Sequence, residues 1–121
     1  MHPAMSDAIQ QLDERLLRFA RERDWEQFHS PKNLAMALGG EAGELLEIFQ
    51  WLSEEQSRNL PPEKREAAAM ELADILIYLV RLAHTLEIDL LDAAWRKIAL
   101  NEKRYPVEKV KGDARRAEEY D

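Results

Sequence analysis

The chain has 121 residues, 45% of them hydrophobic, so we expect one modest domain and no second one. Its 17 basic and 24 acidic side chains give a net charge of −7, the wrong sign for a protein that wraps nucleic acid. The sequence holds no cysteine, which excludes disulfides, thiolate zinc sites and thiol nucleophiles.

The composition also bears on location and fold class. The first five residues lack the basic and apolar regions of a secretion signal, and no uncharged stretch reaches bilayer length. We therefore expect a cytoplasmic protein without a membrane partner. Glycine and proline are few, with four and five residues, and this favours helices joined by short connections. The composition predicts an all-α fold.

The spacing of apolar residues predicts a bundle of four main helices. Ser6, Ser30 and Asp89 are candidate N-caps of the first, second and fourth of them. We expect residues 1–106 to form the domain and the charged segment 107–121 to be a loosely held tail. The expected helices span about 6–24, 31 to 51 or 53, 62–86, and 90–105.

The third of these helices is apolar on every side. From Ala67 to Ala83 only Glu71, Asp74 and Arg81 interrupt the apolar sequence. Such a helix must be covered all round, and three other helices of one small bundle could barely cover it. We infer a homo-oligomer, a dimer or a tetramer, in which a second copy supplies the missing cover. Three charges within this stretch argue against the rival interpretation, a membrane span.

Two pairs of carboxylates stand on helix faces that should be buried. Glu41 and Glu44 are three residues apart on the second helix, and Glu71 and Asp74 repeat this spacing on the third. Buried carboxylates must be neutralised, and Arg81 could pair with at most one or two of them. A divalent cation would neutralise all four, and oxygen ligands favour Mg²⁺, or Mn²⁺ in its place.

Either pair alone would be an ordinary feature of a solvated helix, so the metal site depends on the two pairs together. A divalent cation neutralises phosphate charge, polarises phosphorus and generates hydroxide from water, so the site favours a hydrolase of phosphate esters. Lys97, Asn101 and Arg104 form a polar stripe on the fourth helix that could reach phosphates, in this subunit or a neighbouring one. A solvated face is the alternative for this stripe.

Beyond these spacings, the segments around the carboxylates resemble a known family. Gly40-Glu41-Ala42-Gly43-Glu44-Leu45, Glu71-Leu72-Ala73-Asp74 and Trp25-Glu26-Gln27-Phe28-His29 are similar to segments of the MazG-type all-α NTP pyrophosphohydrolases, most closely of the dCTP-cleaving branch. The resemblance covers most of the chain from about residue 18 onward. Gly40 stands where the family pattern has the first glutamate of a doublet, and Leu16 replaces a base-contacting histidine of the animal dCTP enzymes.

The resemblance implies roles for individual residues. Glu41, Glu44, Glu71 and Asp74 would be the Mg²⁺ ligands and the catalytic carboxylates. Because Leu16 offers no hydrogen bond, selectivity for cytosine should be weaker than in relatives with a histidine there. The residues that would bind the nucleotide are Trp25, Glu26, Gln27, Phe28, His29, Trp51 and Tyr78.

These observations together predict an enzyme of nucleotide-pool sanitation. We expect it to hydrolyse a deoxynucleoside triphosphate, dCTP or a 5-modified dCTP, to the monophosphate and pyrophosphate. One alternative is a pyrophosphohydrolase for another, non-standard NTP, with the same metal site and a different aromatic slot. The other alternative is a helical adaptor without enzymatic activity, whose apolar third helix serves assembly alone.

Overall fold

The computed structural model describes residues 3–114, and all of its regular elements within this range are helices. The all-α prediction is therefore confirmed. Four helices are long: α1 (Pro3–Glu22), α2 (Pro31–Phe49), α4 (Pro62–Thr85) and α5 (Leu90–Arg104). Three elements are short: the 3₁₀ helix η1 (Glu26–Phe28), α3 (Glu54–Arg58) and α6 (Val107–Val110).

Local capping explains where two of the long helices, α2 and α5, begin. The Ser30 side chain accepts a hydrogen bond from the Asn33 backbone nitrogen at 3.2 Å, and Asp89 caps α5 in the same way. The expected cap at Ser6 is wrong, because α1 begins at Pro3 and Ser6 lies inside it. Proline is well suited to the first turn of a helix, where its missing N–H would have no partner.

The three short elements were not expected from the apolar spacing, since each is too short to show a period. The helix α3 forms around a capping box, in which Ser53 and Gln56 exchange side-chain to backbone hydrogen bonds of 3.1 and 2.9 Å. The helix α6 lies in the segment expected to be a loose tail. Residues 115–121 of that segment lie outside the described residues, so the proposed domain boundary stays a prediction.

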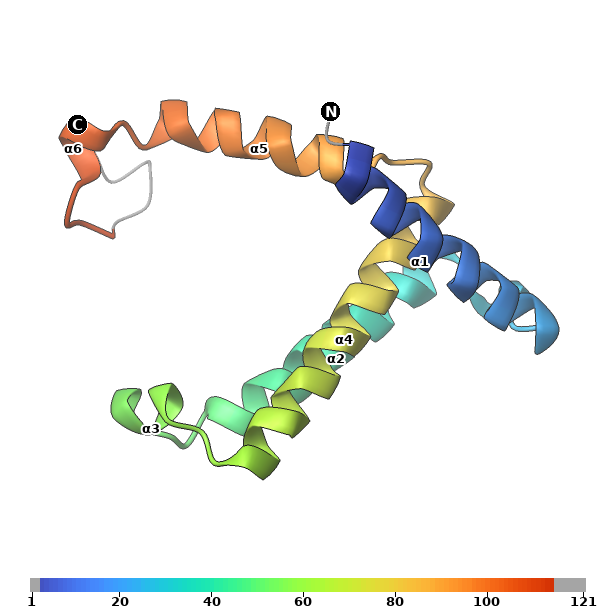
Figure 1. Ribbon diagram of the computed structural model, residues 1–121, viewed down its shortest axis with the longest axis horizontal. Coiled ribbons are helices and arrows are strands. Elements are labelled where there is room, and N and C mark those ends of the chain that lie inside the picture. The colour runs from blue at the N-terminus through green and yellow to red at the C-terminus, as the bar shows by residue number, and fades with distance from the viewer. Residues whose placement is uncertain (1–2, 115–121) are drawn as a thin grey trace.

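The helices α2 and α4 pack side by side as an antiparallel hairpin, and α1 crosses the C-terminal part of α4 (Figure 1). Helix α5 leaves the hairpin and extends away from it (Figure 1). Within a single chain the four long helices therefore do not surround one common core, so the predicted bundle of four main helices is not confirmed by the single chain. The buried apolar residues of the described chain are Ala20, Leu34, Ala68, Val80 and Ala83.

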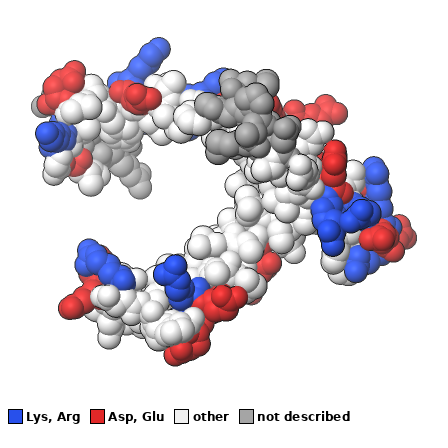
Figure 2. All heavy atoms as spheres, in the orientation of Figure 1, with Lys and Arg blue, Asp and Glu red and all other residues white. Residues whose placement is uncertain are grey.

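The single chain leaves much apolar surface uncovered. Its accessible surface is 9518 Å², whereas a compact monomer of 14.1 kDa should expose about 6,700 Å². Figure 2 shows that the side of the hairpin facing the concave opening is largely uncharged. No helix of the described chain combines the length and the apolar character needed to cross a membrane. The large exposed apolar side chains of the long helices include Met36, Leu46, Met70, Leu72, Leu76, Trp95 and Ile98.

Candidate metal centre

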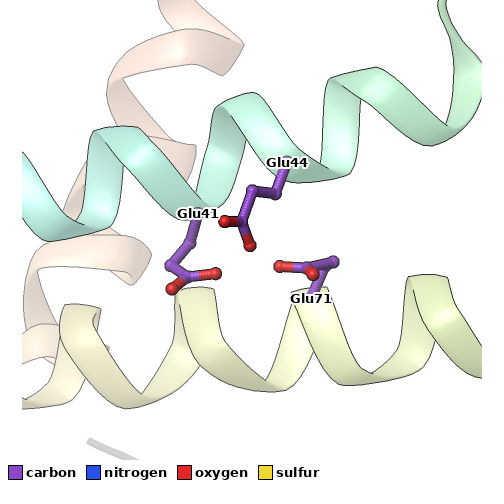
Figure 3. Close-up of side chains that lie close together, drawn as sticks. All are labelled: Glu41, Glu44 and Glu71. Atoms are coloured by element: carbon purple, nitrogen blue, oxygen red, sulfur yellow. The ribbon is translucent and has the colours of Figure 1, made fainter.

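Three glutamates face one another across the α2–α4 hairpin. Glu41 and Glu44 come from α2 and Glu71 comes from α4, and their carboxylates point into the same space (Figure 3). One oxygen of each lies within 4.8 Å of the others. Asp74 stands one turn beyond Glu71 on α4, half-buried, outside this closest group. The antiparallel packing thus brings Glu71 of one predicted pair to the other pair, Glu41 and Glu44, from a separate helix.

The crowding of these groups changes their protonation. The hydrogen bond with Glu71, burial, the hydrogen bond with Glu44 and the charges of Glu44 and Asp74 raise the pKa of Glu41 to about 7. The hydrogen bond from Glu41 acts to lower the pKa of Glu71, but burial, Glu44 and Asp74 outweigh it and the pKa is raised. Below about pH 7, and without a cation, Glu41 therefore keeps a proton, so the carboxylates of this group are not all ionised.

The donor set fits a hard divalent cation. Oε2 of Glu41 and Oε2 of Glu71 are buried and, when both groups are ionised, have no hydrogen-bond donor. Among the residues that the structure describes, no lysine or arginine forms an ion pair with these carboxylates or with Asp74. Buried carboxylate oxygens without a donor are what Mg²⁺ and related cations coordinate, and no softer ligand is present. The four residues could therefore hold such a cation.

The aromatic segment between α1 and α2 is ordered by its own contacts. The Trp25 ring meets the Phe19 ring edge-on, with centroids 5.7 Å apart. Gln27 donates through Nε2 to the backbone oxygen of Asp24 at 2.9 Å and to its carboxylate at 3.1 Å, which leaves the Gln27 carbonyl oxygen available as an acceptor. Glu26 accepts from Arg21 at 3.1 Å. Phe28 is exposed at the end of the segment.

Not all of the predicted nucleotide-binding residues come together in one chain. The segment 25–29 precedes α2 and Trp51 follows it, and the 19 residues of this helix span about 28 Å. Trp51 is 87% exposed, so it has little cover from its own chain. Tyr78 is half-buried on α4, on the side of the carboxylates nearer to segment 25–29. The stripe of Lys97, Asn101 and Arg104 lies on α5, away from the hairpin (Figure 1).

One cluster was missed by the sequence reasoning. Arg81 was considered there only as a partner for the carboxylates, whereas its guanidinium lies 3.6 Å from Asp13 of α1. The same Asp13 contacts His84 at 2.6 Å. The signal in the sequence was the presence of Arg81 and His84 one turn apart on an apolar helix, since such a pair requires a carboxylate from another element.

Comparison with known proteins places the chain in a family. The model of the MazG-like family matches residues 37–119, a segment that contains all four carboxylates, Trp51 and Tyr78. The chain belongs to the MazG-like family. The resemblance noted in the sequence is thus confirmed, although segment 25–29 precedes the matched part.

Curated relatives of this chain give the comparison more detail. The mouse protein dCTP pyrophosphatase 1 is 51% identical over 98 residues, which are 79% of this chain and 58% of the mouse protein. The human protein of the same name is 46% identical over 100 residues, 81% of this chain and 59% of the human one. The chain thus spans less than two thirds of these relatives.

A solved structure is similar to this chain over nearly its whole length. It is the crystal structure of a pyrophosphatase from Archaeoglobus fulgidus, with a TM-score of 0.78 and 38% identity. The match covers 82% of this chain and 93% of the archaeal one. The hairpin that carries the carboxylates is therefore part of an architecture already observed in a crystal.

The raised pKa of Glu41 predicts how stability depends on pH when a chelator is present. Between the ordinary value of 4.5 and about 7 the folded chain keeps a proton that the unfolded chain has lost, so raising the pH costs stability. Glu41→Gln removes this titration. We expect the variant to gain stability relative to the wild type as the pH rises through this window, as measured by urea unfolding at each pH.

The matched control is Glu47→Gln, which changes an exposed glutamate of the same helix. Its stability difference from the wild type should be the same at both ends of the window. If the stability difference between Glu41→Gln and the wild type also did not change with pH, the carboxylates would not interact as described.

Proposed function

We propose that the chain hydrolyses a deoxynucleoside triphosphate to the monophosphate and pyrophosphate, with Mg²⁺, or Mn²⁺ in its place, held by Glu41, Glu44, Glu71 and Asp74. The observation that carries this proposal is the meeting of carboxylates across the hairpin, with two buried oxygens that lack a donor. Membership of the MazG-like family, with relatives named dCTP pyrophosphatase, supports the nucleotide substrate.

The proposed chemistry requires that the negative charge of the phosphates be neutralised. A divalent cation at the cluster would neutralise phosphate charge and make water a better nucleophile. Water attacks the α-phosphorus, the bond to the oxygen bridging the α- and β-phosphorus breaks, and pyrophosphate leaves. Glu44 is the exposed member of the closest group, so it is the carboxylate best able to orient this water and accept its proton.

Recognition of the base is proposed for segment 25–29 and Tyr78. Aromatic rings stack on any base and give little selectivity. The Gln27 carbonyl oxygen, left free by the hydrogen bonds to Asp24, can accept from the exocyclic amino group of cytosine. Uracil and thymine present a carbonyl at that position, which would face the Gln27 oxygen without a hydrogen bond. We therefore favour dCTP or a 5-modified dCTP as the substrate.

A homo-oligomer, a dimer or a tetramer, is part of the proposal. Leu72 and Leu76 are exposed on the side of α4 turned away from its carboxylates, so they need cover that this chain does not supply. Gly39, Gly40 and Gly43 weaken α2 by about 1 kcal/mol each relative to alanine, and a Cβ there would meet nothing within the chain. Close approach of a second copy would account for these glycines.

The same assembly would complete the nucleotide site. Since Trp51 cannot reach segment 25–29 of its own chain, we propose that a neighbouring subunit supplies Trp51 to that slot. The stripe of Lys97, Asn101 and Arg104 would reach the phosphates of a neighbour in the same manner. Trp51 is 87% exposed in the single chain, and α5, which carries the stripe, extends away from the hairpin (Figure 1).

The activity is tested by product analysis. With Mg²⁺ the wild type should release dCMP and pyrophosphate from dCTP, and chelator should stop it. Asp74→Asn should abolish turnover and leave the fold intact, because it removes one ligand charge from a half-buried position. Mg²⁺ should raise the Tm of the wild type, since a ligand bound by the folded state alone stabilises it. Glu47→Gln is the control and should keep full activity.

Two results would contradict this activity. Release of orthophosphate in place of pyrophosphate would mean that a different bond is cleaved. No product from any triphosphate, together with a Tm that does not respond to millimolar Mg²⁺, would favour the adaptor.

The choice of base is tested separately. The kcat/KM for dCTP or its 5-substituted forms should exceed that for dTTP, dUTP and purine triphosphates by about tenfold to a hundredfold, the cost of an unpaired buried polar group. Gln27→Ala and His29→Ala should reduce this difference in kcat/KM between the bases. Trp25→Ala should weaken the binding of all nucleotides alike. Equal kcat/KM for all of them would refute the assignment of the base and leave the metal site standing.

The assembly is tested by light scattering at micromolar concentration, where we expect a dimer or a tetramer. Leu76→Glu should dissociate the assembly. Leu76 is 41% exposed in the single chain, so a glutamate there would be accommodated without rearrangement of the chain, but it would be an unpaired charge in the interface. Leu76→Met, which keeps the apolar volume, is the matched control. Val80→Glu should instead unfold the protein, since Val80 is 3% exposed. A compact wild-type monomer would defeat the proposal.

A further inference from the structure

A second polar cluster lies where α1 crosses α4, away from the carboxylates. Arg81 is 5% exposed, and among residues 8–114 it is the one polar or charged residue that is buried. Its Nη1 lies 3.6 Å from Oδ1 of Asp13, an ion pair too long for a hydrogen bond. The other oxygen of Asp13 contacts Nδ1 of His84 at 2.6 Å. Asp13 therefore holds Arg81 to α1 without satisfying its N–H groups.

Four buried atoms of this region have no hydrogen-bond partner. They are Nε and Nη1 of Arg81, Oδ1 of Asp13 and Nδ1 of His29. A buried guanidinium with N–H groups that find no acceptor is costly, so the acceptors nearby matter. Nδ1 of His29 is an acceptor when the ring is neutral and its proton is on Nε2. In the other tautomer, or in the charged form, Nδ1 would be a donor facing the donors of Arg81.

The electrostatics of the region favour this neutral form. Burial lowers the pKa of His29, the charge of Arg81 lowers it further, and Glu26 opposes them. The other ionisable groups of the cluster are Asp13 on α1 and His84 on α4. Since the ordinary value is 6.5 and the pKa of His29 lies below it, the ring is mostly neutral at neutral pH.

Position along α4 connects the cluster to the nucleotide site. The residues Glu71, Asp74, Tyr78 and Arg81 follow one another along α4 at steps of three, four and three residues. These steps place all four on one face of the helix. His29 ends the aromatic segment that leads into α2. The guanidinium thus stands one turn beyond Tyr78, and its charge acts on His29, the last residue of the segment proposed to bind the base.

We propose that Arg81, held by Asp13, is a positioning residue of the nucleotide site, which engages Nδ1 of His29 directly or through one water and leaves an N–H at Nε2 for the nucleotide. The inference rests on the proposed function, in which His29 contacts the base. A donor at Nε2 suits the carbonyl oxygen or ring nitrogen of cytosine, whereas the Gln27 oxygen suits its amino group. The two side chains together match both kinds of group on that base.

The first experiment follows the His29 ring by NMR titration in chelator without nucleotide, and His29→Gln identifies its resonance. In Arg81→Met the midpoint should move upward, because a nearby cation no longer opposes protonation of the ring. Arg96→Met removes a guanidinium that pairs with Asp92 on α5 at 2.8 Å and should leave the midpoint unchanged. An unchanged midpoint in Arg81→Met would overturn the proposal.

The second experiment separates positioning from chemistry. At pH 8, Arg81→Met should raise KM for dCTP by about tenfold, the cost of one misplaced polar contact, with kcat largely kept. Arg81→Lys should restore the NMR midpoint in part but not the KM, since an ammonium lacks the planar fork of the guanidinium. An equal loss of kcat at constant KM in Arg81→Met would refute a positioning role.

Folding and the proposed function have their own controls. If Arg81→Met does not fold, the double variant Asp13→Asn with Arg81→Met removes both charges together, and the same upward shift is expected in it. The NMR titration needs no turnover. A shifted midpoint with no pyrophosphate from the wild type would therefore refute the proposed function and support the Arg81–His29 contact.

Discussion

The arrangement of this protein depends on like charges held close together by two apolar helices. The packing of α2 against α4 stabilises the hairpin, and the hairpin brings Glu41, Glu44 and Glu71 to within 4.8 Å of one another, where they repel. Below about pH 7 and without a cation, the proton kept by Glu41 relieves part of this repulsion. A divalent cation at this site would offset the repulsion, and this would make its binding favourable.

Much of this could be predicted from the sequence, because it depends on local spacing. The caps at Ser30 and Asp89 and the long helices follow from residues that are neighbours in the chain. The meeting of Glu41 with Glu71 could be expected only because an apolar face must be covered and a charge within it must be neutralised. The recurring segments of the MazG-like family then made the inference specific.

Other features depend on tertiary geometry that no period reveals. Apolar spacing does not determine the exact residue at which a helix starts, so it missed the start of α1 at Pro3. The helices α3 and α6 are too short for apolar spacing to reveal them. The spacing of apolar residues predicts four main helices, but it does not determine the direction of α5, which leaves the hairpin after α4. The partner of Arg81 lies 68 positions earlier in the chain, at Asp13, and only the crossing of α1 over α4 brings the two together.

The position of Trp51, at the far end of α2 from segment 25–29, has a consequence for the behaviour of the protein in a cell. On the proposed assembly, each nucleotide slot is divided between two chains, so the fraction of complete slots is set by the association equilibrium as well as by folding. Turnover per chain would then rise with protein abundance until assembly is saturated. A change in expression level would alter the rate of nucleotide removal more than in proportion, and dilution alone would act as an inhibitor.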